Sequence, residues 1–183
     1  MIFGRGVMKK KILMLQFVGF VCTSVFGVLL HFLYEWSGES IIITPFSGVN
    51  ESTWEHIKLL YFPLFAYALI EMRYFKDRED YWCVKLLGIS FGLVMIPVLF
   101  YTYNGAFGKS PDWLNITIFF VADGLAFLLE SAIFKSNALK CKRSRLSFAL
   151  LCFIGVLFIL FTFVTPEFPL FMDPITGIYG VAS

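Results

Sequence analysis

The segment ILMLQFVGFVCTSVFGVLLHFLY, residues 12–34, contains no acidic side chain, no lysine and no arginine. A helix that crosses a bilayer needs about 20 consecutive apolar residues, and this segment exceeds that length. Its apolar core is also too long for the hydrophobic region of a typical cleaved signal peptide, and no A-x-A cleavage site follows it. We therefore expect residues 12–34 to remain in the protein as a membrane anchor.

The remainder of the chain has the same apolar character. Of its 183 residues, 58% are hydrophobic and 15% are charged, whereas a soluble chain is about 25% charged; the mean hydropathy is +0.78. A backbone in lipid must satisfy its own hydrogen bonds, and no segment alternates as a barrel strand does. The sequence predicts an all-α integral membrane protein, a single transmembrane domain over residues 1–183 with five transmembrane helices. The predicted spans are residues 12–34, 57–75, 83–103, 113–134 and 146–165.

The basic residues predict how these helices are oriented. Lysines and arginines lie before the first span and around the connections that follow the second and fourth spans. Of the 15 lysines and arginines, only Lys58 and Lys109 lie on the opposite side. Basic residues concentrate on cytoplasmic loops, so we predict a cytoplasmic N-terminus, an extracytoplasmic C-terminus and a multi-pass protein of the cell membrane. The net charge of +2 indicates no nucleic-acid partner, and the lipid bilayer is the expected partner.

The four cysteines are Cys22, Cys83, Cys141 and Cys152. Two of them lie within predicted spans and two on the predicted cytoplasmic side. Because none lies in an external loop, we expect no structural disulfide. Their spacing also matches no zinc motif.

The external side of this topology collects an unusual set of polar residues. The outer end of the first span and the stretch NESTWEHIK both lie there. His31 and Glu35 are four residues apart, so they share one side of a helix. The candidate binding residues on this side are His31, Glu35, Asn50, Glu51, Glu55 and His56. Imidazole and carboxylate groups suit Zn²⁺ or another divalent cation, and the metal ligands considered are His31, Glu55 and His56.

A structural role also accounts for part of this stretch. Ser52 and Glu55 have the spacing of a capping box, in which each side chain satisfies a backbone donor at a helix start. Asn50 is a favourable helix cap, and Trp54 suits an interfacial aromatic belt. Capping leaves Glu51 and His56 unexplained. For His31 the alternative to a site is an interfacial histidine that is hydrogen-bonded to Glu35.

The fourth span carries a second set of polar residues. Asn115, Asp123 and Glu130 fall within about 80° of arc on a helix. Asp123 lies about 15 Å along the helix from the start of the span, near the bilayer centre, where a charge costs on the order of 3 kcal/mol. Asp123 is therefore a candidate proton or ion site. The alternatives are that Asp123 is protonated, or that it only holds helices together by a hydrogen bond to a hydroxyl such as that of Tyr67, Ser90 or Thr117.

Two further carboxylates, Glu71 and Glu130, lie near the predicted cytoplasmic ends of their spans. Arg73 and Lys135 are close to them in sequence. Long basic side chains at the ends of spans extend to the headgroup region, so we expect interfacial ion pairs here rather than a site.

The tail TPEFPLFMDPITGIYG, residues 165–180, contains three prolines and cannot form a sixth span. It is too apolar to lie free in water, so we predict that it folds back over the external face. DPITG is typical of a turn in which Gly177 takes a positive φ. The turn would bring Asp173 toward the NESTWEH helix start, which makes Asp173 a further candidate binding residue.

The stretches PFSGVNESTWEHIKLLYFP, residues 45–63, and PLFMDPITGIYG, residues 169–180, are the most distinctive of the chain. With them the sequence resembles an uncharacterised family of small bacterial polytopic membrane proteins that share an N-E-S-x-W-E-H-x-K signature. The resemblance covers most of the chain. It implies a membrane location, the bacterial inner membrane, and supplies no catalytic residues.

Three functions remain open on these residues. The favoured one is a polar pocket on the extracytoplasmic face that binds a divalent metal or a lipid headgroup. The second is a small proton- or ion-coupled transporter that uses Asp123; five helices are few for a carrier, so it would need to form a homo-oligomer. The third is a non-catalytic membrane accessory protein whose external face binds a partner. The sequence contains no P-loop and no G-x-S-x-G motif, and it leaves open whether the protein is an enzyme.

Overall fold

Five α-helices make up most of the chain in the computed structural model, which describes residues 2–136 and 139–181. The helices are α1 (Ile2–Trp36), α2 (Thr53–Glu71), α3 (Tyr81–Phe107), α4 (Asp112–Ser136) and α5 (Ser144–Phe163). Short 3-10 helices, Met72–Tyr74 and Pro169–Phe171, follow α2 and α5. The described residues form no β-strand, only an isolated bridge between Met172 and Tyr179. The all-α prediction is therefore confirmed, and each predicted span overlaps one helix.

Four of the helices in the described residues are long and apolar enough to cross a membrane. They are α1 from Met8 to Trp36, α3, α4 from Trp113 to Ser136, and α5. The second predicted span, α2, is not among them, because Glu55, Lys58 and Glu71 lie within its 19 residues. The helix at this position is therefore present, but it is more polar than the other four.

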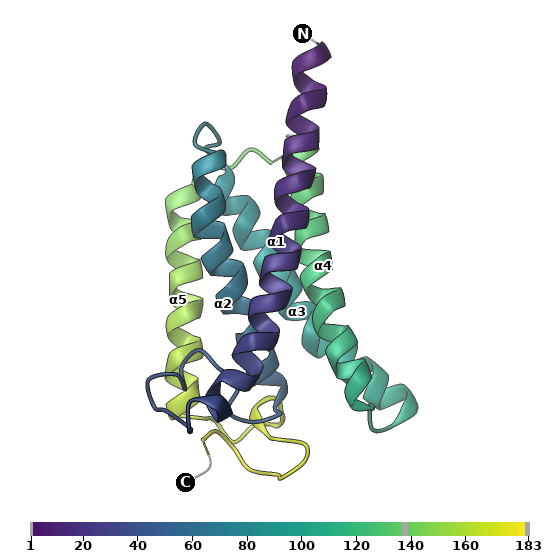
Figure 1. Cartoon of the computed structure of the whole chain (residues 1–183), viewed down its shortest axis with the longest axis vertical. Coiled ribbons are helices and arrows are strands. Elements are labelled where there is room, and N and C mark those ends of the chain that lie inside the picture. The colour runs from purple at the N-terminus through teal and green to yellow at the C-terminus, as the bar shows by residue number, and fades with distance from the viewer. Residues whose placement is uncertain (1, 137–138, 182–183) are drawn as a thin grey trace.

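Helix α2 lies inside the bundle, in contact with α1, α3 and α5 (Figure 1). Leu60 and Ala68 on this helix are fully buried. The hydroxyl of Tyr61 donates a hydrogen bond of 2.6 Å to the Leu151 carbonyl of α5. The lysine and both glutamates of α2 are buried as well. The polar helix is thus enclosed by the more apolar ones.

Helices α3 and α4 form a closely packed antiparallel pair. A Cβ added to Gly92 of α3 would lie 3.0 Å from the Cβ of Ala126 on α4, so the absence of a side chain at residue 92 lets the backbones approach. Toward the α3–α4 connection the pair tilts away from the other helices (Figure 1). The two cavities described under the candidate functional site open at this end.

The connections alternate between two ends of the bundle (Figure 1). The start of α1 and the α2–α3 and α4–α5 connections lie at one end, called the inner end here. The α1–α2 and α3–α4 connections lie at the other, called the outer end, together with the tail after α5. The inner end is the end that the basic residues predict to be cytoplasmic.

The tail folds back over the outer end, as predicted. Gly177 has a φ of +73°, and its N–H donates to the Asp173 carbonyl at 2.9 Å. The Asp173 carboxylate accepts from the N–H of Ile175 at 2.7 Å. This side chain therefore closes the turn.

One expectation about the cysteines is wrong. Cys83, near the start of α3, and Cys141, before α5, form a disulfide. The expectation rested on the compartment assigned to these residues, which carries no information about distance. The fold brings together two cysteines that lie 58 positions apart in the sequence.

Candidate functional site

Three side chains from separate parts of the chain meet at the outer end. Glu51, in the connection before α2, lies between His31 of α1 and His56 of α2. Its carboxylate oxygens are 3.5 Å from Nε2 of His31 and 3.6 Å from Nε2 of His56, and the imidazole centroids are 5.8 Å apart. The exposed fractions of the side chains are 30% for His31, 22% for His56 and 43% for Glu51. We call these three residues the outer cluster.

The start of α2 fixes the position of His56. Ser52 is the N-cap residue, and its hydroxyl accepts from the N–H of Glu55 at 3.3 Å. Nδ1 of His56 lies 2.9 Å from the Ser52 carbonyl oxygen. A carbonyl oxygen only accepts, so Nδ1 carries a proton. Nε2 therefore presents a lone pair toward Glu51 when the ring is neutral, and a donor when the ring is protonated.

Glu55 is not part of the outer cluster and instead forms a buried ion pair. Its carboxylate is 2.6 Å from Nζ of Lys58 and accepts from the N–H of Val49 at 3.0 Å. Nζ of Lys58 also donates to the Thr44 carbonyl and to the Thr162 hydroxyl. The capping-box prediction is half confirmed, because the Ser52 N–H donates to Asn50 and not to Glu55. The buried pair of Glu55 and Lys58 joins the α1–α2 connection to α2 and α5.

This arrangement bears on the predicted metal ligands His31, Glu55 and His56. The structure engages Glu55 with Lys58 and places Glu51 between the histidines instead. Within residues 2–136 and 139–181, no group of three or more His, Cys, Asp or Glu side chains could hold a metal ion. The outer cluster therefore does not have the geometry of a metal centre.

The remaining candidates on this side lie around the outer cluster. Glu35 and Asn50 line a hollow of about 280 Å³ that also contacts His31 and Glu51. The Asn50 amide donates to the Gly180 carbonyl at 2.9 Å, which ties the tail to the start of α2. Asp173 is buried in its turn, and the residue after it, Pro174, lines a cavity beside the cluster.

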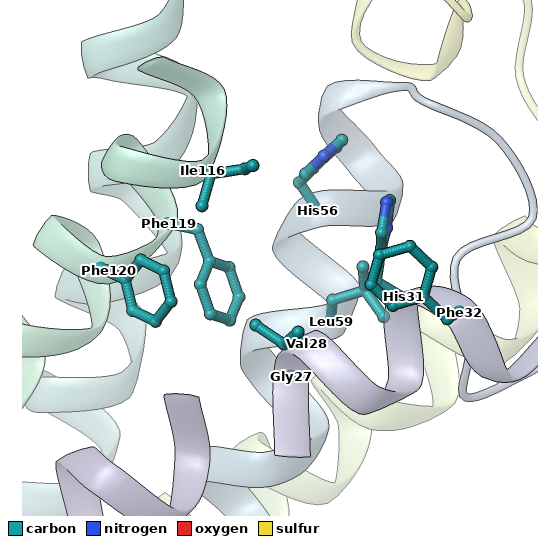
Figure 2. Close-up of a pocket in the computed structure, with 9 residues that line it drawn as sticks. All are labelled: Gly27, Val28, His31, Phe32, His56, Leu59, Ile116, Phe119 and Phe120. Atoms are coloured by element: carbon teal, nitrogen blue, oxygen red, sulfur yellow. The ribbon is translucent and has the colours of Figure 1, made fainter. Parts of the chain in front are cut away.

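Two larger cavities meet at the outer cluster. The first, of about 330 Å³, is bounded by α1, α2 and α4, with His31 and His56 on one side and Phe119 and Phe120 on the other (Figure 2). Apart from the histidines, the residues that line it are apolar. Figure 2 shows Val28 and Phe32 of α1 beside Leu59 of α2.

The second cavity, of about 470 Å³, lies between α2, the outer ends of α3 and α4, and the tail. Its wall is more polar than that of the first. The polar residues in it are Glu51, Thr53, His56, Tyr101, Asn104, Lys109, Ser110 and Asn115. His56 and Phe119 line both cavities, so an apolar space and a polar space adjoin at the cluster.

Asp123 lies deeper in the bundle and is fully buried. Its carboxylate accepts from the hydroxyls of Thr23 at 2.8 and 2.9 Å and of Ser24 at 2.8 Å, both on α1. The hydroxyls considered from the sequence were on other helices. The signal that could have identified them is the pair of adjacent hydroxyl residues in the middle of the largely apolar first span.

The inner half of the bundle holds a buried ionic network. Nζ of Lys85 is 2.5 Å from Glu71 and 2.5 Å from Glu130. Gln16 donates to the other oxygen of Glu71 at 2.6 Å. The predicted pairing partners, Arg73 and Lys135, do not have this role. Lys85 lies close to the start of the third predicted span, so its position in the sequence alone groups it with the basic residues of the preceding connection. We call Gln16, Glu71, Lys85 and Glu130 the inner network.

These features define a helical bundle with membrane-length helices and a polar site at one end. The chain belongs to a family described as a family of unknown function, DUF6512, whose profile matches residues 6–181. No curated protein and no solved structure matches the chain. The predicted resemblance to an uncharacterised family agrees with this membership, which assigns no chemistry to the site.

Proposed function

We propose that the chain is a multi-pass protein of the cell membrane that crosses it five times, with the inner end cytoplasmic. The crossing by α2 is supported by its packing. Its charged side chains are buried and paired within the protein, so they need not contact lipid. At about 1.5 Å per residue, its 19 residues extend about 28 Å, close to the thickness of a bilayer core.

Labelling of single cysteines, introduced after the four native cysteines have been replaced by serine, tests this topology. The variant Lys109→Cys should react with a membrane-impermeant maleimide on intact cells. The variant Lys76→Cys should react only after the membrane is opened, because it lies in the α2–α3 connection at the inner end. Equal labelling of both variants on intact cells would exclude the orientation.

We further propose that the outer end binds a phospholipid headgroup. One observation carries this proposal: an apolar cavity and a polar cavity share His56 and Phe119. An acyl chain would occupy the apolar cavity between α1 and α4. The headgroup would occupy the polar cavity beside the outer cluster. Such a division of apolar and polar surfaces suits an amphiphile.

The charges around the polar cavity favour a phosphate-bearing headgroup. Two lysines belong to the outer side of the chain. Lys58 is buried against Glu55, whereas Lys109 lines the polar cavity. Asn104 and Asn115 line it as well and supply polar groups for the headgroup. Glu51 also lines this cavity, and its carboxylate suits the amine of a zwitterionic headgroup.

The other candidate functions have less support. A metal site at the outer cluster lacks a set of ligands among the described residues; metal analysis of the purified protein, with His31→Ala and His56→Ala, tests it directly. The transporter alternative needs Asp123 to face an accessible space. Asp123 instead accepts hydrogen bonds from Thr23 and Ser24. It is not among the residues that line the outer cavities.

The headgroup proposal is tested by filling the apolar cavity. Val28 lines this cavity, and Val25, one turn away on α1, is also exposed and lies outside both linings. We expect Val28→Trp to remove co-purifying phospholipid in native mass spectrometry, whereas Val25→Trp retains it. Retention of the same lipid stoichiometry in both variants would rule out this site.

A further inference from the structure

A further cavity, distinct from the two outer cavities, lies along α1 and α4 in the inner half of the bundle. It has a volume of about 410 Å³, and its lining shares no residue with either outer cavity. Leu13 and Phe17 of α1 and Leu128 of α4 line it and are largely exposed. We call it the inner groove. It opens on the side of α1 and α4 that faces away from the bundle core. This side faces lipid if the two helices cross a membrane.

Two buried polar atoms, on residues that line the inner groove, have no hydrogen-bond partner among the described residues. They are Oε1 of Gln16 and Oγ of Ser131. Their residues are 3% and 5% exposed. A buried polar atom without a partner is unfavourable, and both atoms belong to a wall that is otherwise apolar.

The inner network fixes which atom Gln16 presents. Nε2 of its amide donates to Glu71 at 2.6 Å, and Lys85 holds Glu71 in turn. The amide therefore cannot flip without placing its oxygen against a carboxylate. Oε1 consequently remains an acceptor without a partner on a residue that lines the groove, and a ligand that reaches it must supply an O–H or N–H donor.

The chemistry of the groove selects among lipids. The described residues that line it include no charged side chain, and the nearby cation, Lys85, is held by Glu71 and Glu130. A phosphate or carboxylate would lose its hydration without gaining a counter-charge. An alkane would leave both polar atoms unpaired. A hydroxyl group can donate to an acceptor such as Oε1 of Gln16 or accept from a donor such as the hydroxyl of Ser131.

We propose that the inner groove binds a neutral lipid that carries a free hydroxyl group, a long-chain alcohol in the chemical sense. Its apolar chain lies against Leu13, Phe17 and Leu128, and its hydroxyl bonds to Gln16 and Ser131. This site does not depend on the headgroup site at the outer end.

Photo-crosslinking in nanodiscs tests the proposal. The probe is octadecanol carrying a diazirine, and its matched control is the methyl ether of the same probe, which has no donor. We expect the alcohol to label peptides of α1 around residues 13–20 or of α4 around residues 124–131. Its labelling should exceed that of the ether by about fivefold, the effect of one hydrogen bond.

Two variants separate the hydroxyl contact from the space. Ser131→Ala removes a hydroxyl that has no partner within the described residues, so the fold loses no bond and labelling by the alcohol should fall about fivefold. Gly124→Leu should abolish labelling, because Gly124 lines the groove and an added Cβ there has only an ordinary contact, 3.6 Å from Phe20. The exposed position Val121, outside this lining, provides the control Val121→Leu.

The outcomes are decisive in both directions. Labelling that follows the hydroxyl and falls in both variants supports the site. Equal labelling by the alcohol and its ether overturns it, as does labelling that neither Ser131→Ala nor Gly124→Leu reduces. Loss of folding is monitored by size-exclusion chromatography, and if one variant aggregates, the other decides.

Discussion

The inner network and the outer cluster both bring carboxylates together with basic side chains, but the two differ in burial and in contact distance. In the inner network, Lys85 lies 2.5 Å from each of two glutamates, and all three side chains are buried. In the outer cluster, Glu51 lies 3.5 and 3.6 Å from two partly exposed histidines. The first arrangement holds its charges against one another inside the protein. The second leaves them available, beside two cavities. Burial and contact distance, more than residue type, separate a structural ion network from a candidate site.

The largest expected effect comes from removing the cation of the inner network. Lys85→Met leaves Glu71 and Glu130 buried without a counter-charge. We expect a loss of about 3–5 kcal/mol in the free energy of unfolding, measured by denaturant titration in detergent. The matched control is Lys76→Met at an exposed position, which should change stability by less than about 0.5 kcal/mol. Equal stability of the two variants would contradict a structural role for the inner network.

An intermediate effect is expected at Asp123, which belongs to neither region. Asp123→Leu removes the acceptor for Thr23 and Ser24 and should cost about 1–3 kcal/mol. Asp123→Asn keeps an acceptor oxygen and should cost less. Thermal unfolding of both variants in detergent measures the difference. If Asp123→Asn retains stability yet abolishes ion or solute uptake in liposomes, the transporter alternative gains the support it now lacks.

A smaller effect is expected where the tail is tied to the start of α2. Asn50→Ala removes the bond to Gly180 and the acceptor for the Ser52 N–H. We expect a loss of about 1 kcal/mol and faster proteolysis after residue 165, detected by mass spectrometry of limited digests. The comparison variant is Asn115→Ala, on α4, which should leave cleavage of the tail unchanged.

The smallest effect on stability is expected in the outer cluster itself. His56→Ala removes a partly exposed contact with Glu51 and should change the free energy of unfolding by no more than about 1 kcal/mol. The same variant should lose co-purifying phospholipid, as measured by native mass spectrometry. A large loss of stability with unchanged lipid content would make the outer cluster another structural network and remove the contrast with the inner one.

Local sequence signals predicted a large part of this molecule. Hydrophobic runs located each helix, because apolar length is a property of the segment alone. Ser52 was predicted at the start of α2, and it is the N-cap. The turn around Asp173 and Gly177 was predicted because proline and glycine restrict the backbone locally. The alternation of basic residues agrees with the two ends of the bundle (Figure 1).

Only the tertiary structure decided which polar groups meet. Glu51 and Glu55 are four residues apart, and the sequence makes both of them candidate binding residues. In the structure Glu51 lies between two histidines, whereas Glu55 is buried against Lys58. The bonds of Asp123 to α1, the disulfide and the inner network join residues that are distant in the sequence. Such pairs depend on how each helix is rotated against its neighbours. Hydrophobic length does not encode this rotation, because it follows from the packing of all the helices together.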